Sequence, residues 1–386
     1  MAVIYEQLVP VLFGTDALQE MARKAKGAGK ERAFLCCDKG VRQSGGADML
    51  ESILKEAGIQ TYIFDSCMPD PTDAFLDKLY EKAAEWKADL VLGLGGGSSM
   101  DTAKALGVLL DNGPPLSKYM KENGATHFEV KTPVYVLPTS SGTGAECTPM
   151  CVIHEIASDC KKAILCPAAL AVLDPTLTLS CPSNVTLNSG MDALSHAVEA
   201  YTSVAPNPKD KILAIHAIQL IAENLPKCID HPDDLEARTR MLFASNIAGI
   251  AFAGMSVHVG HLFAHEVGLR YHLNHGYCCA ISIPETIEFV AQYKGKEIRE
   301  IGQALGCQVD PSVSDQAAAH QVAEAVRSLM HRCGLKPLKA YRIDREELLS
   351  FASAAVDNNW FHIMCPGDVS YTQMKDFFAA CYDHYQ

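Results

Sequence analysis

Five histidines stand close together in one apolar stretch of the chain. His258, His261, His265, His272 and His275 fall within eighteen positions of a sequence that has fourteen histidines in all. A single histidine in such surroundings is usually a hydrogen-bonded core residue, whereas five imidazoles together indicate a site. Their spacing allows the first three to share one helical face and places the last two in a turn. The residues alone do not say which of the five bind a ligand.

A carboxylate and a further imidazole precede this block. Asp192 and His196 are four residues apart in GMDALSHAVEAY (190–201), so on a helix both side chains lie on one face. A carboxylate and an imidazole provide half of a divalent-metal site. The same pair is also common on helix surfaces and at caps, and only the additional histidines favour the metal interpretation.

Two glycine-rich loops follow apolar runs in the first half of the chain. GGGSSMDTAK (95–104) leads from a predicted strand into a helix, where glycines allow close approach and free N–H groups favour a phosphate. This loop departs from the usual GxGxxG pattern, and glycine after a strand also occurs in ordinary tight turns. PTSSGTGAE (138–146) ends another strand in hydroxyl residues and glycines. Two such loops together predict a dinucleotide site.

Asp38 follows the apolar run that ends at Cys37. Its carboxylate can accept hydrogen bonds from ribose hydroxyls and would repel a 2′-phosphate, which favours NAD over NADP. The alternative is a turn-forming aspartate before Lys39 and Gly40.

The elements that carry these groups change character along the chain. Short β-branched runs alternate with helical patterns in the first half, which predicts a parallel sheet covered by helices. Beyond Pro182 only helical spacing is found. We therefore expect an α/β domain over 1–183, of Rossmann-like type, and an all-helical domain over 184–386. The predicted strands are Arg32–Cys36, Thr61–Phe64, Leu90–Gly93 and Pro133–Leu137, and the clearest helices are 211–225 and 315–331.

One uncharged stretch, Met241–Ala264, is long enough to span a bilayer. It contains His258, His261 and Asn246, which would be costly in lipid, so it is interpreted as a buried core helix instead.

Charge and cysteine usage exclude several classes of function. The chain has 33 basic and 46 acidic residues with no basic block, which argues against a nucleic-acid or anionic-membrane surface. Its fifteen cysteines show no CxxC pair and are interpreted as reduced, mostly buried thiols, which indicates a reducing compartment. No secretory signal is recognised at the N-terminus, and a cytoplasmic location is expected.

Taken together, GGGSSMDTAK, PTSSGTGAE, GMDALSHAVEAY and HLFAH with the later NHG closely resemble the iron-containing (group III) alcohol dehydrogenase family. The resemblance implies a nucleotide domain followed by a helical metal domain, the dehydroquinate synthase-like fold. It also implies hydride transfer between NAD and a small alcohol or aldehyde, at one divalent ion that is usually Fe²⁺, although Zn²⁺ would satisfy the same ligands. Family members commonly form homodimers or larger assemblies.

The resemblance also assigns the histidines. It implies that Asp192, His196, His261 and His275 are the metal ligands. His265 corresponds to a non-ligand near the nicotinamide, suited to proton transfer or substrate orientation. His258 and His272 match no ligand and are expected to be structural or to line the pocket.

For the nucleotide, the resemblance implies contacts from the two glycine loops and from three residues outside them. Asp38 matches a ribose-contacting aspartate, Asp70 lies where a short polar residue nears the adenosine, and Lys162 resembles a nucleotide-contacting lysine. From the loops the candidates are Gly96, Gly97, Ser98, Asp101, Thr139, Ser140 and Thr143.

Arg270 departs from the family pattern, which has a second glycine and an aromatic in the segment after the second histidine. A buried cation beside the metal would suit a carboxylate or sulfonate aldehyde, as in the family's sulfoacetaldehyde reductases. The alternative is that Arg270 pairs with Glu266 or points to solvent, which leaves a generalist short-chain alcohol, lactaldehyde or 4-hydroxybutyrate dehydrogenase. A dehydroquinate synthase-type lyase and a non-catalytic metal-binding homologue are more remote alternatives.

Overall fold

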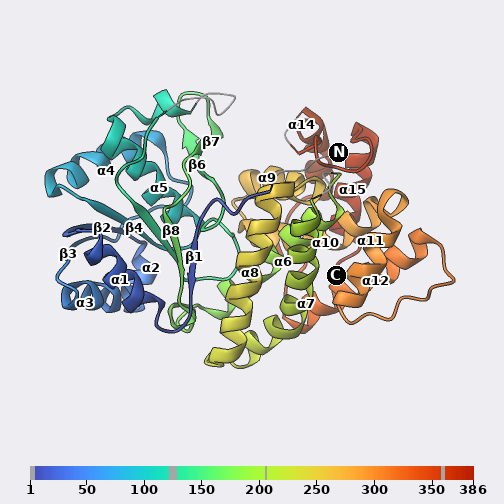
Figure 1. Cartoon of the computed structure of the whole chain (residues 1–386). Coiled ribbons are helices and arrows are strands. Elements are labelled where there is room, and N and C mark those ends of the chain that lie inside the picture. The colour runs from blue at the N-terminus through green and yellow to red at the C-terminus, as the bar shows by residue number, and fades with distance from the viewer. Residues whose placement is uncertain (1–4, 121–127, 205–206, 358–360) are drawn as a thin grey trace. The chain divides into compact units, whose positions relative to one another are not determined.

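The computed structural model describes residues 5–120, 128–204, 207–357 and 361–386. The chain folds into two compact units, residues 6–181 and residues 182–386, the second of which also includes Tyr5. Figure 1 shows strands and helices in the first unit and helices in the second.

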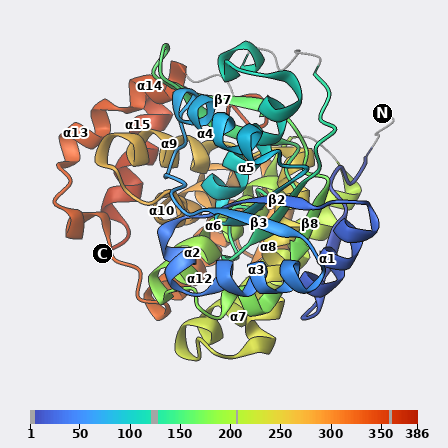
Figure 2. The ribbon, with the colours of Figure 1, turned by 90° about the vertical axis from the view of Figure 1, so that its left-hand side faces the viewer.

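A six-stranded parallel sheet forms the centre of the first unit, in the order β1-β8-β5-β4-β2-β3. Helices α1 and α3 cover one face of the sheet, and α4 and α5 cover the other (Figure 2). The central strand β4 is buried along its whole length, as expected for a parallel strand covered on both faces. The strands are β1 (Val11–Phe13), β2 (Arg32–Cys36), β3 (Gln60–Phe64), β4 (Leu90–Gly95), β5 (Val134–Pro138) and β8 (Leu170–Leu173).

The helices of this unit alternate with its strands, which confirms the predicted α/β class. They are α1 (Ala17–Gly27), α2 (Lys39–Gln43), α3 (Gly46–Glu56), α4 (Asp73–Trp86) and α5 (Gly97–Asn112), with 3₁₀ turns at Leu116–Tyr119 and Pro175–Thr178. All four predicted strands are present. Sequence patterns missed β1, β8 and an antiparallel hairpin of β6 (Met150–Glu155) and β7 (Cys160–Leu165).

Among its described residues the second unit contains helices and no strand, as predicted. Its core is formed mainly by α6, α7, α8, α9 and α10. The helices are α6 (Ser183–Thr202), α7 (Pro208–Asp230), α8 (Leu235–Met255), α9 (Val259–Tyr271), α10 (His275–Phe289), α11 (Ala291–Ala304), α12 (Asp315–Arg332), α13 (Arg345–Ser350), α14 (Ala352–Asp357) and α15 (Tyr371–Asp383), with a 3₁₀ turn at Leu338–Tyr341.

The single buried helix predicted over Met241–Ala264 is wrong. Helix α8 ends at Met255, and the next residue, Ser256, has a φ of 63°. The axes of α8 and α9 are bent by 104° relative to each other. A left-handed residue cannot continue a right-handed helix, so the break is set at this serine. It turns the histidines that follow onto a new helix.

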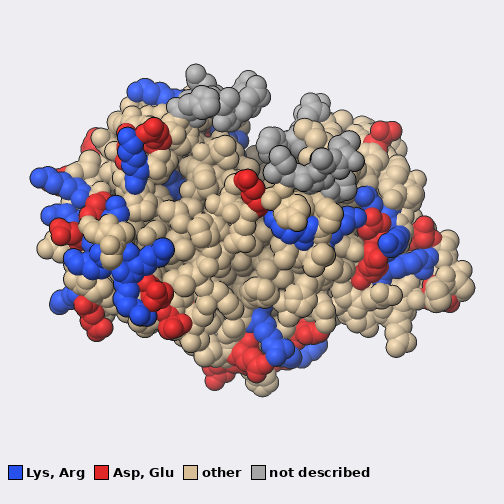
Figure 3. All heavy atoms as spheres, viewed as in Figure 1, with Lys and Arg blue, Asp and Glu red and all other residues tan. Residues whose placement is uncertain are grey.

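By length and composition, α7 could cross a membrane, and the bent pair α8 and α9 passes the same test together. However, α7 packs against α6 and α8, and its buried residues, which include Ala214, Ile218, Ile221 and Leu225, belong to the core of the second unit. On the face drawn in Figure 3, basic and acidic side chains are interspersed.

Candidate functional site

The turn between β4 and α5 has the geometry of a phosphate-binding loop. Gly95 has a φ of 146°, and a Cβ at this position would lie 2.8 Å from Ser99 Oγ. A Cβ on Gly93 would lie 2.8 Å from Ala103 Cβ, so glycine lets the strand pack closely against the helix. The helix that begins at Gly97 has free N–H groups in its first turn, where Ser98 lies, and they favour an anion.

The structure brings the second glycine loop beside the first. Strands β4 and β5 are neighbours, and Thr139 N–H donates to Gly95 O over 3.1 Å. A Cβ on Gly97 would lie 3.4 Å from Thr143 Cγ2, and one on Gly96 would lie 4.0 Å from Ser140 Oγ. Backbone N–H groups and hydroxyls from both loops therefore gather at one edge of the sheet.

Asp38 has the turn-forming role that was one of its two predicted alternatives. It is the N-cap of α2, and its Oδ1 accepts a hydrogen bond of 3.0 Å from Val41 N–H. Its Oδ2 lies 3.6 Å from where a Cβ on Gly95 would be. Since β2 and β4 are neighbours whose chain connections run in opposite directions, Asp38 lies at the switch point where parallel sheets bind nucleotides.

The acidic candidates Asp70 and Asp101 lie near each other and near the β6–β7 hairpin. Lys161 pairs with Asp70 at 2.6 Å, and Asp101 accepts a hydrogen bond from the backbone N–H of Val152. Burial raises the pKa of Asp101 to about 6, although Lys104 and Lys161 act in the opposite direction.

Two lysines of this region have roles that the sequence analysis missed. Lys162 pairs with Glu155 at 2.5 Å across the hairpin, and it is the neighbouring Lys161 that contacts Asp70. Lys104 is buried, and its Nζ donates to the carbonyl oxygens of Ala145, Thr148 and Met150 over 2.6 to 3.0 Å. This ammonium ties α5 to the segment after the second glycine loop. The only sign of this role in the sequence was that Lys104 ends the motif GGGSSMDTAK.

The metal candidates come from three helices of the second unit. Asp192 and His196 lie one turn apart on α6, His261 lies on α9, and His275 is the first residue of α10. A Cβ on Gly276 would collide with the carbonyl of Asn188. Only glycine at this position lets His275 approach α6 so closely.

The three imidazoles surround one carboxylate oxygen. The Nε2 atoms of His275, His196 and His261 lie 3.6, 3.8 and 3.9 Å from Asp192 Oδ1. Among the described residues this buried oxygen has no hydrogen-bond partner. Ligand atoms on a tetrahedral ion with bonds of about 2.0 to 2.2 Å lie about 3.4 Å apart, so the group fits a divalent cation. The structure thus places all four predicted ligands around this oxygen, with His196 outside the group of ligand atoms that all lie within 4.8 Å of one another.

Glu199 is a functional residue that the sequence analysis did not find. Its Oε1 accepts a hydrogen bond of 2.6 Å from His261 Nδ1, and its Oε2 accepts the backbone N–H of His258. Burial would raise the pKa of Glu199, but the neighbouring histidines and these hydrogen bonds lower it to about 2. A carboxylate behind a ligating histidine fixes the tautomer and orientation of the ring. The sequence did contain a signal for Glu199, because it follows Asp192 by seven residues in GMDALSHAVEAY and this spacing puts both on one face of a helix.

The remaining histidines have separate roles. His258 is fully buried beside Thr202, with Nε2 3.0 Å from its hydroxyl, and burial lowers its pKa. His272 is exposed and ends α9 with a φ of 52°. His265 is half-buried and meets the rings of His275 and Phe361 edge-on, at centroid distances of 5.5 and 4.9 Å.

The expected buried cation beside the metal is wrong. Arg270 is exposed, pairs with Glu266 one turn earlier, and lies with its guanidinium 4.5 Å from the ring centroid of Phe351. It follows His261 by nine residues, which is half a revolution around α9, so the two side chains lie on opposite sides of the helix. The alternative of a Glu266 pair is what the structure contains.

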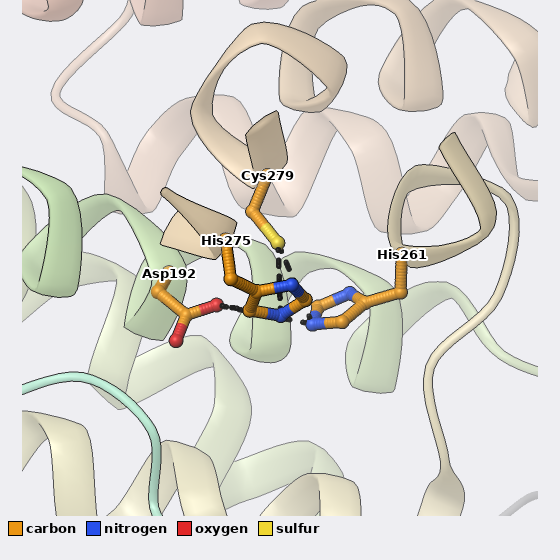
Figure 4. Close-up of side chains that lie close together, drawn as sticks. All are labelled: Asp192, His261, His275 and Cys279. Carbon is orange, nitrogen blue, oxygen red and sulfur yellow. Dashed lines mark hydrogen bonds and ion pairs between the residues drawn. The ribbon is translucent and has the colours of Figure 1, made fainter. Parts of the chain in front are cut away.

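Cys279 is a further member of the metal group that the sequence analysis missed. A ligand atom from each of Asp192, His261, His275 and Cys279 lies within 4.8 Å of the others. Figure 4 shows these four side chains converging. Cys279 follows His275 by four residues on α10, so the helical spacing that linked Asp192 with His196 was also present here.

Comparison with known proteins covers both units. The model described as "Iron-containing alcohol dehydrogenase" matches residues 9–175, and "Fe-containing alcohol dehydrogenase family, C-terminal" matches residues 186–382. The NAD-dependent methanol dehydrogenase of Bacillus methanolicus is 32% identical over 84% of this chain and 85% of its own length. The sulfoacetaldehyde reductase of Bilophila wadsworthia is 29% identical over 92% of each. A solved 1,3-propanediol oxidoreductase superposes with a TM-score of 0.92 at 27% identity, over 98% of this chain and 100% of that one. With both units matched in order, the chain belongs to the iron-containing alcohol dehydrogenase family.

Proposed function

We propose that this NAD-linked, metal-dependent enzyme interconverts a small, neutral alcohol and its aldehyde, with one divalent ion held by four side chains of the second unit. The observation that carries the assignment of the ion is the buried Asp192 Oδ1 with three imidazole nitrogens around it. The proposed ligands are Asp192, His196, His261 and His275.

We further propose that the first unit binds NAD along the edge formed by its two glycine loops. The open N–H groups at the start of α5 and the hydroxyls of the second loop would receive the pyrophosphate. Asp38 would accept hydrogen bonds from the adenosine ribose through the oxygen that faces Gly95. The proposed contacts are Asp38, Asp70, Gly96, Gly97, Ser98, Asp101, Thr139, Ser140 and Thr143, with Lys162 the least supported because it pairs with Glu155.

The chemistry then divides between the cofactors and the chain. A divalent ion supplies a Lewis acid for the substrate oxygen, and the nicotinamide carries the hydride. His261 is held by Glu199 so that its Nε2 faces Asp192. His265, whose ring edge meets the ring of His275, is suited to orient the substrate or to move its hydroxyl proton.

Two observations bear on the substrate. Relatives are named for methanol and 1,3-propanediol, and Arg270, the cation that was predicted beside the metal, is exposed and pairs with Glu266. Both support a short neutral substrate. A sulfonate aldehyde is the second candidate, because the sulfoacetaldehyde reductase of Bilophila wadsworthia aligns over 92% of each chain.

The test is NADH oxidation by enzyme reconstituted with Fe²⁺ or with Zn²⁺, against short aldehydes paired as neutral and anionic. The proposal expects a higher kcat/KM for the neutral member of each pair. A consistent preference for the sulfonate would replace it with the second candidate. Absence of turnover with every aldehyde and both metals would contradict the proposal as a whole.

We also propose a cytoplasmic location and a homodimer or larger assembly. None of the fifteen cysteines is assigned to a disulfide, and reduced thiols are the state that a reducing compartment maintains. Cell fractionation and sedimentation velocity of the purified enzyme would test the two statements separately.

A further inference from the structure

Cys279 places a sulfur atom inside the metal group. It lies one helical turn after His275 on α10, and its Sγ is 3.5 Å from His275 Nε2 and 3.7 Å from His261 Nε2. Figure 4 shows the thiol directed at both rings, on which the Asp192 carboxylate also converges. The side chain is fully buried, so solvent does not account for its orientation.

These distances fit coordination. An ion with bonds of about 2.3 Å to sulfur and 2.0 to 2.1 Å to nitrogen separates the two ligand atoms by about 3.6 Å in a tetrahedral arrangement. Both measured S···N distances lie within 0.1 Å of that value. The N···O distances to Asp192 Oδ1, at 3.6 to 3.9 Å, are longer than the corresponding edge of about 3.4 Å.

A simple thiol hydrogen bond accounts less well for the same contacts. Glu199 takes the Nδ1–H of His261, so in the neutral ring Nε2 carries a lone pair. A thiol can donate to one of the two Nε2 atoms and accept from the other, so hydrogen bonds account for both contacts only when His275 carries its proton on Nε2, and they leave Asp192 Oδ1 without a partner among the described residues. A cation at the centre of the group satisfies both imidazoles, the sulfur and the carboxylate together.

We propose that Cys279 is a thiolate ligand of the divalent ion in a set of four with Asp192, His261 and His275, whose ligand atoms all lie within 4.8 Å of one another, in the position that the sequence assigned to His196. The ion then keeps a fifth position for the substrate oxygen. The inference rests on the proposed metal site. Binding the ion releases the thiol proton to solvent, so charge and atoms balance.

A thiolate ligand also changes which metal the site prefers. Soft sulfur ligands favour Zn²⁺, whereas an all-nitrogen and oxygen set discriminates less. Cys279 therefore biases this member of an iron-named family towards Zn²⁺. Replacing the sulfur by oxygen in Cys279→Ser should lower the affinity for Zn²⁺ by about tenfold or more and change that for Fe²⁺ less.

The chain offers a matched control one residue away. Cys278 is equally buried, but it lies a third of a turn around α10, and its Sγ is 3.9 Å from the position of a Cβ on Gly268 of α9. Cys278→Ser removes a thiol from the same helix without removing the proposed ligand.

The decisive measurement is the absorption spectrum of the full-length apoprotein titrated with Co²⁺ to one equivalent. The proposal expects a thiolate-to-cobalt charge-transfer band in the near ultraviolet for the wild type and Cys278→Ser, and its loss in Cys279→Ser. The visible d–d bands report binding itself. Bound Co²⁺ without the charge-transfer band in the wild type, or a band that survives in Cys279→Ser, overturns the Cys279 inference alone.

If Co²⁺ fails to bind, or binds equally well to Asp192→Ala, the proposed metal site itself is wrong, and the Cys279 inference is overturned with it. If Cys279→Ser does not fold, Cys279→Ala serves in its place, and the wild-type spectrum still decides whether a thiolate is present.

Discussion

Glu199 holds one nitrogen of His261 while the other faces the metal group. His261 Nδ1 lies 2.6 Å from Glu199 Oε1, and His261 Nε2 lies 3.9 Å from Asp192 Oδ1. A Cβ on Gly260 would lie 2.7 Å from Glu199 Oε1, so the residue before the histidine leaves room for the carboxylate. The ring is thereby fixed from behind in the orientation that a ligand needs.

Replacing Glu199 by glutamine should weaken metal binding by about 10- to 100-fold while the fold is kept. The amide can still hydrogen bond, but it lacks the charge that raises the pKa and basicity of His261 against the effect of burial. Competition with a chromophoric chelator measures the change, and circular dichroism checks the fold.

Ser195→Ala is the matched control for that variant. The Ser195 hydroxyl donates to Glu199 Oε1 over 3.0 Å without touching His261. Its loss removes one hydrogen bond to the carboxylate but keeps the Glu199 charge and the bond to His261 Nδ1, so the metal affinity should change by less than about fivefold. An equal loss in both variants would mean that Glu199 acts on the packing of the second unit and not on the histidine.

Arg270→Ala should leave the choice between neutral and anionic aldehydes unchanged. The guanidinium pairs with Glu266 and stacks on Phe351, on the side of α9 opposite His261. An exposed pair of this kind stabilises a helix by about 0.3 to 0.5 kcal/mol, so the expected effect is a small loss of thermal stability. The ratio of kcat/KM values for acetaldehyde and sulfoacetaldehyde measures specificity. A selective loss of about tenfold on the sulfonate would restore the original hypothesis for Arg270.

The sequence predicted the strands of the sheet better than the geometry of the metal group. Helical spacing related Asp192 to His196, but nothing local related either to His275, which lies 83 positions beyond Asp192. Their approach depends on α6 and α10 packing so closely that only glycine fits at 276. Only the resemblance to a known family supplied that long-range information.

Local patterns also account for the errors. Glu266 and Arg270 are four residues apart, which is the spacing of a helical ion pair. Arg270 therefore pairs with Glu266 on its own helix and does not reach the metal candidates. Met241–Ala264 is uniformly apolar, and composition gave no sign that Ser256 adopts a left-handed conformation. The β6–β7 hairpin was missed because β7 is largely exposed, with Ile164 as its one buried residue and no buried alternation to mark it as a strand.

Asp38→Asn should shift the cofactor preference towards NADP. Asparagine is as good an N-cap as aspartate, so the bond from Val41 N–H is kept while the charge is removed. The repulsion of a 2′-phosphate then disappears, and the ratio of kcat/KM for NADPH to that for NADH should rise by about tenfold. Glu56→Gln, which removes an exposed carboxylate at the far end of α3, is the charge-matched control and should leave the ratio unchanged. An unchanged ratio in Asp38→Asn would leave Asp38 with only its capping role.

Asp101→Asn should change how stability depends on pH. Burial raises the pKa of Asp101 from 3.8 to about 6, so the folded protein holds a proton there that the unfolded chain has already lost. The folded state therefore loses stability as pH rises from about 4 to 6, and the difference is constant above that range. Between pH 5 and 7 the wild type should lose roughly 1 kcal/mol relative to the variant. Urea unfolding of both proteins at these two pH values measures the difference. The asparagine can still accept the hydrogen bond from Val152 N–H, so identical pH profiles would mean that Asp101 is ionised across this range and that its neighbouring lysines outweigh its burial.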